Sequence, residues 1–116
     1  MKDLQKLALF RIGLGDYARS NSGPLYKEIL SCARNHNVIS ASVFRSIDSV
    51  LMKGKPEMPR LFGGHDKSQA IIMEISVRQE NKQELLSALR EILQLSKDPV
   101  VISILDTEVE VFGLDP

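Results

Sequence analysis

Leu7-Ala8-Leu9-Phe10-Arg11-Ile12-Gly13-Leu14 is the stretch that decides the fold of this 116-residue chain. Every second residue in it is apolar, from Ala8 through Phe10 and Ile12 to Leu14. An apolar period of two is typical of a β-strand that buries one face. We therefore expect a strand over residues 7–14, with this apolar face against the core.

Five further segments show periodic apolar positions. In chain order we expect a helix over 24–37, strands over 39–47 and 70–77, a helix over 81–95 and a strand over 100–112. The resulting order is β-α-β-β-α-β, which is the ferredoxin-like arrangement of the α+β class. It predicts a four-stranded antiparallel sheet with both helices on one face, built as a single domain over residues 1–116. The other face carries Phe44 and Ile72, and a part-apolar face of this kind is usually covered by another subunit.

Local signals predict where several of these elements begin and end. Pro24 suits the first position of a helix, and either Asn35 or Asn37 can end that helix, because asparagine tolerates the left-handed conformation. Asn81 followed by Glu84 predicts a capping box at the second helix. The apolar phase shifts within 100–112, which predicts a bulge or a strand that serves two surfaces.

Composition excludes several classes of protein. Hydrophobic residues make up 43% and charged residues 26%, and the formal net charge is +0, as in an ordinary globular domain and unlike a disordered chain. No apolar run approaches the ~20 residues of a membrane span, and the N-terminus lacks the apolar stretch of a signal peptide, so we expect a cytoplasmic protein without membrane insertion. Cys32 is the only cysteine, which excludes an internal disulfide and a cysteine-based zinc site.

Residues 48–68 fit no apolar period and form a long connection, which in a compact domain is usually functional. Glycines in and around it allow backbone N–H groups to approach a ligand, while lysine and arginine supply donors for phosphate or carboxylate oxygens. An anion site here is one interpretation; a solvated loop is the other. A second place for an anion is the turn Ser20–Gly23 ahead of the first helix, although a plain capped turn explains it better.

Two arginines interrupt strands. Arg45 shares the apolar face of its predicted strand and lies where the long connection begins, so it either snorkels at the end of the sheet, binds a ligand or pairs with a neighbouring acid. Arg11 is opposite in phase to Phe10, and we expect it to form a structural ion pair with Glu74 or Glu108 across the sheet.

Several motifs carry a resemblance to a known family. They are Phe10-Arg11-Ile12-Gly13-Leu14-Gly15, Gly23-Pro24-Leu25-Tyr26-Lys27-Glu28, Ala33-Arg34, Ile39-Ser40-Ala41-Ser42-Val43-Phe44-Arg45-Ser46 and Pro99-Val100-Val101. Together they make the chain resemble the bacterial PII-like family known as domain of unknown function 190. Proteins of this family are similar in fold to the PII nitrogen regulators and to CutA.

The resemblance implies a non-enzymatic regulatory homotrimer. It would bind a small anionic effector, with an adenine nucleotide as one option, in clefts between subunits, and it would signal to a partner protein through the 48–68 loop. The candidate effector-binding residues are Arg45, Ser46, Lys53, Lys55, Arg60, Gly63 and Gly64. The connection at 96–99 is shorter than the one with which PII proteins hold nucleotide phosphates, so the effector and its mode of binding stay open. No permanent cofactor is expected.

Other classes of function have less support. A CutA-like trimer would bind a divalent metal through His65, Asp66 or His36, but these residues show no metal-ligand spacing, and His36 reads better as a helix-end residue. A purely structural trimer without a ligand is a further alternative. An RNA-binding domain of the same topology needs aromatic residues on its central strands, which 70–75 lacks. No nucleophile, base or metal set supports an enzyme.

Overall fold

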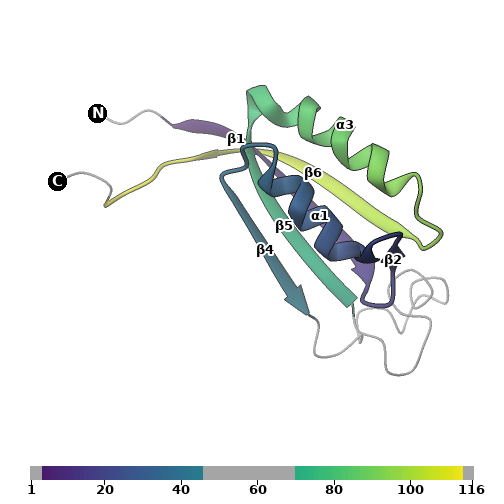
Figure 1. Cartoon of the computed structure of the whole chain (residues 1–116). Helices are drawn as coiled ribbons and strands as arrows, with labels where there is room; N and C mark the ends of the chain where they lie inside the picture. Colours follow the sequence, from purple (N-terminus) through teal and green to yellow (C-terminus); the bar gives the residue numbers. More distant parts are fainter. Residues whose placement is uncertain (1–3, 46–69, 114–116) are drawn as a thin grey trace.

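The computed structural model of the chain describes residues 4–45 and 70–113. Its centre is a four-stranded antiparallel sheet in the order β4-β5-β1-β6, and the two helices cover one face of it (Figure 1). The strands are β1 (Gln5–Gly15), β4 (Ser40–Arg45), β5 (Ala70–Arg78) and β6 (Val100–Val109). The helices are α1 (Leu25–Arg34) and α3 (Lys82–Leu93). The predicted ferredoxin-like fold is confirmed.

The core lies between the sheet and the helices. The apolar face of β1 that the sequence indicated is fully buried, and β5 adds the matching face. The helices close the core with residues at helical spacing, chiefly Leu25 and Ile29 from α1 and Leu85 and Leu89 from α3. Because β1 and β5 are the two central strands, their alternation is the clearest signal in the sequence.

The first helix begins one residue later than the sequence predicts. Pro24 is its N-cap, with an extended ψ of 132°, and it pairs with Arg19 in a small hairpin of β2 (Arg19–Ser20) and β3 (Gly23–Pro24). The helix ends at its C-cap Asn35, and Asn37 takes the left-handed conformation with a φ of 52°. The helix thus ends before the predicted residue 37, with Asn35 as its C-cap at a φ of −86°, and of the two asparagines Asn37 is the one in the left-handed conformation. Within the described residues, no helix has the length and apolar character that crossing a membrane requires.

The predicted capping box at the second helix is wrong. Asn81 is the N-cap of α3, but its side chain makes no capping hydrogen bond. A 3₁₀ turn, η2 (Gln79–Asn81), comes directly before the helix. Because the chain is already coiled when it reaches Asn81, the backbone there has a ψ of 3° instead of the extended geometry that a capping side chain needs.

Asp106 of β6 anchors this turn. Its Oδ1 accepts hydrogen bonds from Gln79 Nε2 at 2.8 Å and from Lys82 Nζ at 3.0 Å, and the same Gln79 nitrogen donates to the Leu7 carbonyl at 2.9 Å. These donors favour the ionised carboxylate, so the hydrogen bonds from Gln79 and then Lys82 lower the pKa of Asp106. The contacts join the start of α3 to the outer strand of the sheet.

The lowered pKa predicts a pH-dependent contribution of Asp106 to stability. A depressed carboxyl pKa stabilises the fold above the unfolded-state pKa of about 3.9 and loses that effect as the pH falls through the folded-state pKa. We expect Asp106→Asn to lower Tm at pH 7 and to match the parent protein in stronger acid. Thermal unfolding between pH 7 and pH 2 measures this difference, with Glu110→Gln as a control for the loss of one negative charge. A Tm difference that stays constant with pH would contradict the assignment.

The last strand contains no bulge. Its pairing with β1 runs in one continuous register from Gln5 opposite Val109 to Leu14 opposite Val100. The apparent phase shift arises because β6 carries apolar residues on both faces: Ile104 packs against the core, whereas Leu105 is 62% exposed on the other side. The second sequence interpretation, a strand that serves two surfaces, is the one that fits.

The sheet face that points away from the helices is called the open face below. Its residues line up across the strands in rows that the strand register sets. Registered rows cross all four strands: Phe44 pairs with Ile72, Ile72 with Gly13 and Gly13 with Val101. Another row brings Leu9 opposite Leu105. In the isolated chain Phe44, Val101 and Leu105 are exposed. The open face is therefore mainly apolar at its two ends.

Candidate functional site

Arg45 is the last residue of β4, and its side chain faces the helix layer. Its register partner is Ile71, which is buried in the core, so the two side chains share that face. The Arg45 guanidinium lies 3.6 Å from Asp16, measured from Nη1 to Oδ2, and 5.6 Å from the centroid of the Tyr26 ring. Of the roles that the sequence left open, pairing with a neighbouring acid is the one present. The side chain remains 51% exposed, so its donors are accessible to an anion.

Asp16 and Tyr26 come from different elements. Asp16 follows the end of β1, and Tyr26 lies in the first turn of α1. Asp16 was absent from the candidate residues because its partnership with Arg45 depends on tertiary structure. A signal existed, since an antiparallel order of β4-β5-β1 brings the end of β1 to the same end of the sheet as the end of β4.

The remaining candidate residues lie outside the described part of the chain. Of the predicted effector-binding set, Arg45 alone falls within residues 4–45 and 70–113. The others, which lie between 46 and 69, are Ser46, Lys53, Lys55, Arg60, Gly63 and Gly64. Their convergence on an anion stays a prediction.

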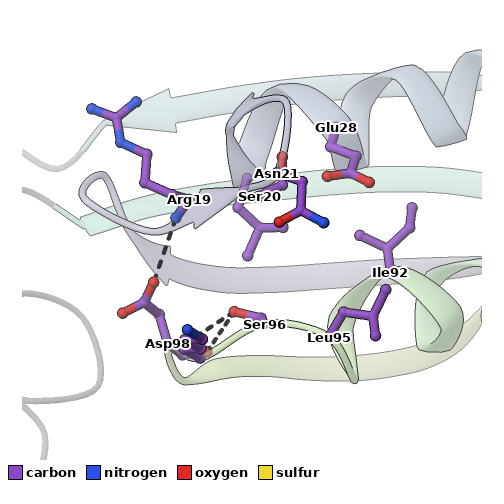
Figure 2. A pocket seen from close by; sticks show the side chains of 10 residues that line it. Arg19, Ser20, Asn21, Glu28, Ile92, Leu95, Ser96 and Asp98 are labelled. Atoms are coloured by element: carbon purple, nitrogen blue, oxygen red, sulfur yellow. Dashed lines mark hydrogen bonds between the residues drawn. The ribbon is translucent and has the colours of Figure 1, made fainter.

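A polar groove at the same end of the molecule was missed by sequence reasoning. It has a volume of about 270 Å³ and lies between the β2–β3 hairpin, the helices α1 and α3, and the connection to β6. Figure 2 shows Glu28, Asn21 and Ile92 along it, while the Arg19 guanidinium points away. The sequence signal was weak because a two-residue hairpin turn, Asn21-Ser22, looks like any polar loop.

Two local networks shape the groove. Asp98 accepts a hydrogen bond from the backbone N–H of Arg19 at 3.4 Å. The Ser96 hydroxyl donates to the Asp98 carbonyl at 3.0 Å and accepts from the Asp98 N–H at 3.1 Å, which closes a tight turn. Burial and then the Asp98 carboxylate raise the pKa of Tyr17. The hairpin and the connection into β6 are thus held together, and the turn Ser20–Gly23 is explained by its own hydroxyl hydrogen bonds.

The predicted ion pair of Arg11 is confirmed, with Glu74 as its partner. The Arg11 Nε and Nη2 atoms both donate to Glu74 Oε2, at 3.0 and 2.7 Å. Register decides between the two acids, because Glu74 lies directly opposite Arg11 on β5, whereas Glu108 lies opposite Lys6. The pair sits on the open face, between the two apolar rows.

The only cysteine and one histidine meet near the end of α1. His36 Nδ1 lies 2.8 Å from the Cys32 carbonyl oxygen, in agreement with the predicted helix-end role. Burial, followed by the charges of Glu28 and Glu91, raises the pKa of the Cys32 thiol. Across the two described ranges, no three His, Cys, Asp or Glu side chains gather into a metal-binding cluster; His65 and Asp66 lie outside those ranges. The geometry around Cys32 is that of a structural thiol.

The sequence matches one protein family over most of its length. The family is DUF190, described as "Uncharacterized ACR, COG1993", and the match covers residues 7–97. This chain belongs to DUF190. The resemblance drawn from the motifs is therefore confirmed. No curated protein matches the sequence.

Solved structures show the same fold as this DUF190 chain. CPII from Thiomonas intermedia K12, bound to ADP, AMP and acetate, matches with a TM-score of 0.62 and 14% identity, over 95% of this chain and 94% of that chain. A putative PII-like signalling protein from Thermus thermophilus matches with a TM-score of 0.59 and 18% identity, over 93% and 92%. CPII bound to ADP and bicarbonate gives 0.57 and 17%, over 92% and 91%. At these identities the likeness establishes the fold of the DUF190 chain.

Proposed function

We propose that this chain is a non-enzymatic, PII-like regulatory protein whose Arg45 binds a small anionic effector. An adenine nucleotide is the first candidate, because CPII, which shares the fold, is described with ADP and AMP bound. The observation that carries the proposal is the half-exposed Arg45 guanidinium at the end of β4. A guanidinium there can offer paired N–H donors to a phosphate or carboxylate group.

The proposed effector cleft also uses residues beyond β4. Arg45 is joined in this proposal by Ser46, Lys53, Lys55, Arg60, Gly63 and Gly64, and residues 48–68 carry the signal to a partner protein. Such a switch requires the effector to bind the two signalling states with different affinity.

The same proposal includes a homotrimer. Its support is the open face, where exposed apolar residues of β4 and β6 stand in register with half-buried Leu9 and Ile72, on either side of the Arg11–Glu74 ion pair. Exposed apolar residues that gather on one face of a sheet are consistent with a subunit interface. Three copies that turn their open faces toward a common axis would bury these rows and create clefts between subunits.

Arg45→Gln tests the effector site. Hydrogen bonds to a charged group contribute about 1.5–3 kcal/mol, so we expect the Kd for ADP to rise roughly 10- to 100-fold. Isothermal titration calorimetry gives the Kd directly. ADP at 100 times Kd should also add about 2.7 kcal/mol to the stability of the parent protein.

Arg34→Gln is the matched control for this experiment. It removes the same charge from the exposed last turn of α1, at the opposite end of that helix from Tyr26, and should leave the Kd unchanged. Equal ADP affinity in the Arg45→Gln variant and the parent protein would refute the site.

A further inference from the structure

Arg45 is neutralised by Asp16 without being tightly bonded to it. The 3.6 Å separation of Nη1 and Oδ2 is that of an ion pair, longer than the 2.7–2.9 Å typical of a charge-assisted hydrogen bond. On the open face, by contrast, Arg11 donates to Glu74 at 2.7 and 3.0 Å. The Arg45 donors are thus available for exchange with another anion.

Tyr26 and Asp16 interact with the Arg45 guanidinium in different ways. The Tyr26 ring centroid lies 5.6 Å from Arg45 Cζ, within the range of a cation–π contact. This contact places the Arg45 cation over the Tyr26 ring and carries no opposing charge. Asp16 acts as a charge, and its Oδ2 lies 3.6 Å from Arg45 Nη1, a donor that an oxyanion would also use.

Backbone hydrogen bonds fix the turn that carries Asp16. The Ala18 N–H donates to the Gly15 carbonyl at 3.1 Å, and the Leu25 N–H donates to the Ala18 carbonyl at 2.9 Å. The backbone N–H of Arg19 is held by Asp98 at 3.4 Å. The Asp16 side chain is 26% exposed, so it lies partly buried beside Arg45 on a turn whose backbone is fixed.

We propose that Asp16 sets the affinity of the proposed effector site by competing with the effector for Arg45. This inference rests on the proposed function. An incoming phosphate or carboxylate takes the guanidinium edge from Asp16 and is repelled by its negative charge at short range. The effector therefore binds more weakly than Arg45 alone would allow.

The test compares Asp16→Asn with the parent protein by calorimetry, with ADP as the probe. Exposed ion pairs of this kind are worth up to about 1 kcal/mol, so removal of the charge should tighten ADP binding roughly two- to fivefold. Glu110→Gln removes the same charge from the segment after β6 and should leave the Kd unchanged. Asp16→Ser is a second variant in case asparagine disturbs the turn.

A double-mutant cycle separates the direct effect from a general one. In the Arg45→Gln background, Asp16→Asn should change the Kd by much less than it does alone. An equal change of the Kd in both backgrounds overturns the proposed competition, as does unchanged or weaker ADP binding by Asp16→Asn. In either case the proposed function still stands if Arg45→Gln weakens ADP binding. If the parent protein does not bind ADP or bicarbonate, the proposed function fails, and this inference with it.

Discussion

Leu105→Lys is expected to convert the proposed trimer into monomers. Leu105 lies on the open face, opposite Leu9 of β1, and is 62% exposed in the single chain. A lysine there loses little within the subunit, since the side chain already faces solvent. In an assembled trimer the same ammonium group would be buried among apolar side chains without a partner, which is strongly destabilising. Size-exclusion chromatography with light scattering measures the mass of the assembly.

Leu95→Lys is the matched control for this change. Leu95 follows α3 on the helix side of the sheet and is 77% exposed, so the substitution has the same chemistry on the opposite surface. We expect Leu95→Lys to keep the mass of the parent protein. A trimeric Leu105→Lys variant would show that the open face is not the interface.

Oligomer and effector predictions are linked. If the effector binds in clefts between subunits, monomeric Leu105→Lys should lose ADP binding although Arg45, Asp16 and Tyr26 remain in place within each chain. Retained binding by the monomer would place the whole site inside one subunit. The mass of the Leu105→Lys variant thus tests the open face as the interface, and its ADP affinity tests whether the effector site needs more than one subunit.

Alternation in the sequence predicted the fold well because the sheet has one buried face. β1 and β5 lie in the centre, and every second residue on each is fully buried. The ion pair of Arg11 could likewise be predicted from the alternation, because a charged residue on a central strand needs a partner on a neighbouring strand. Strand register then selected Glu74 over Glu108, because Ser103 is the residue opposite Arg11 on β6.

Features that depend on tertiary geometry were less predictable. The capping box failed because η2 coils the chain before Asn81, and no local signal announces that turn. Of the two interpretations of the phase shift in the last strand, the bulge was wrong, because exposed Leu105 resembles a core residue out of phase, and the strand that serves two surfaces fits. Asp16 was not predicted as a site residue because its partner Arg45 is distant in sequence, and the strand order brings the two residues together.

Phe10→Ala should give the largest loss of stability in a single subunit. Phe10 is fully buried in the middle of β1, between the facing positions Ile75 on β5 and Ile104 on β6. Truncation of a buried phenylalanine removes its transfer free energy and leaves a cavity, which together cost about 3–5 kcal/mol. Urea unfolding at a fixed protein concentration should show a lower midpoint with an unchanged m value, and the fixed concentration is needed because oligomer stability depends on mass action.

Phe112→Ala is the control for the loss of an aromatic ring. Phe112 lies beyond β6 and is 77% exposed in the single chain, so the free energy of unfolding should change by no more than about 0.5 kcal/mol. The contrast depends on position alone, because both variants delete the same ring. A Phe10→Ala loss as small as that of Phe112→Ala would mean that the core between β1 and the helices is not closely packed, and the assignment of β1 as the strand that organises the fold would fail.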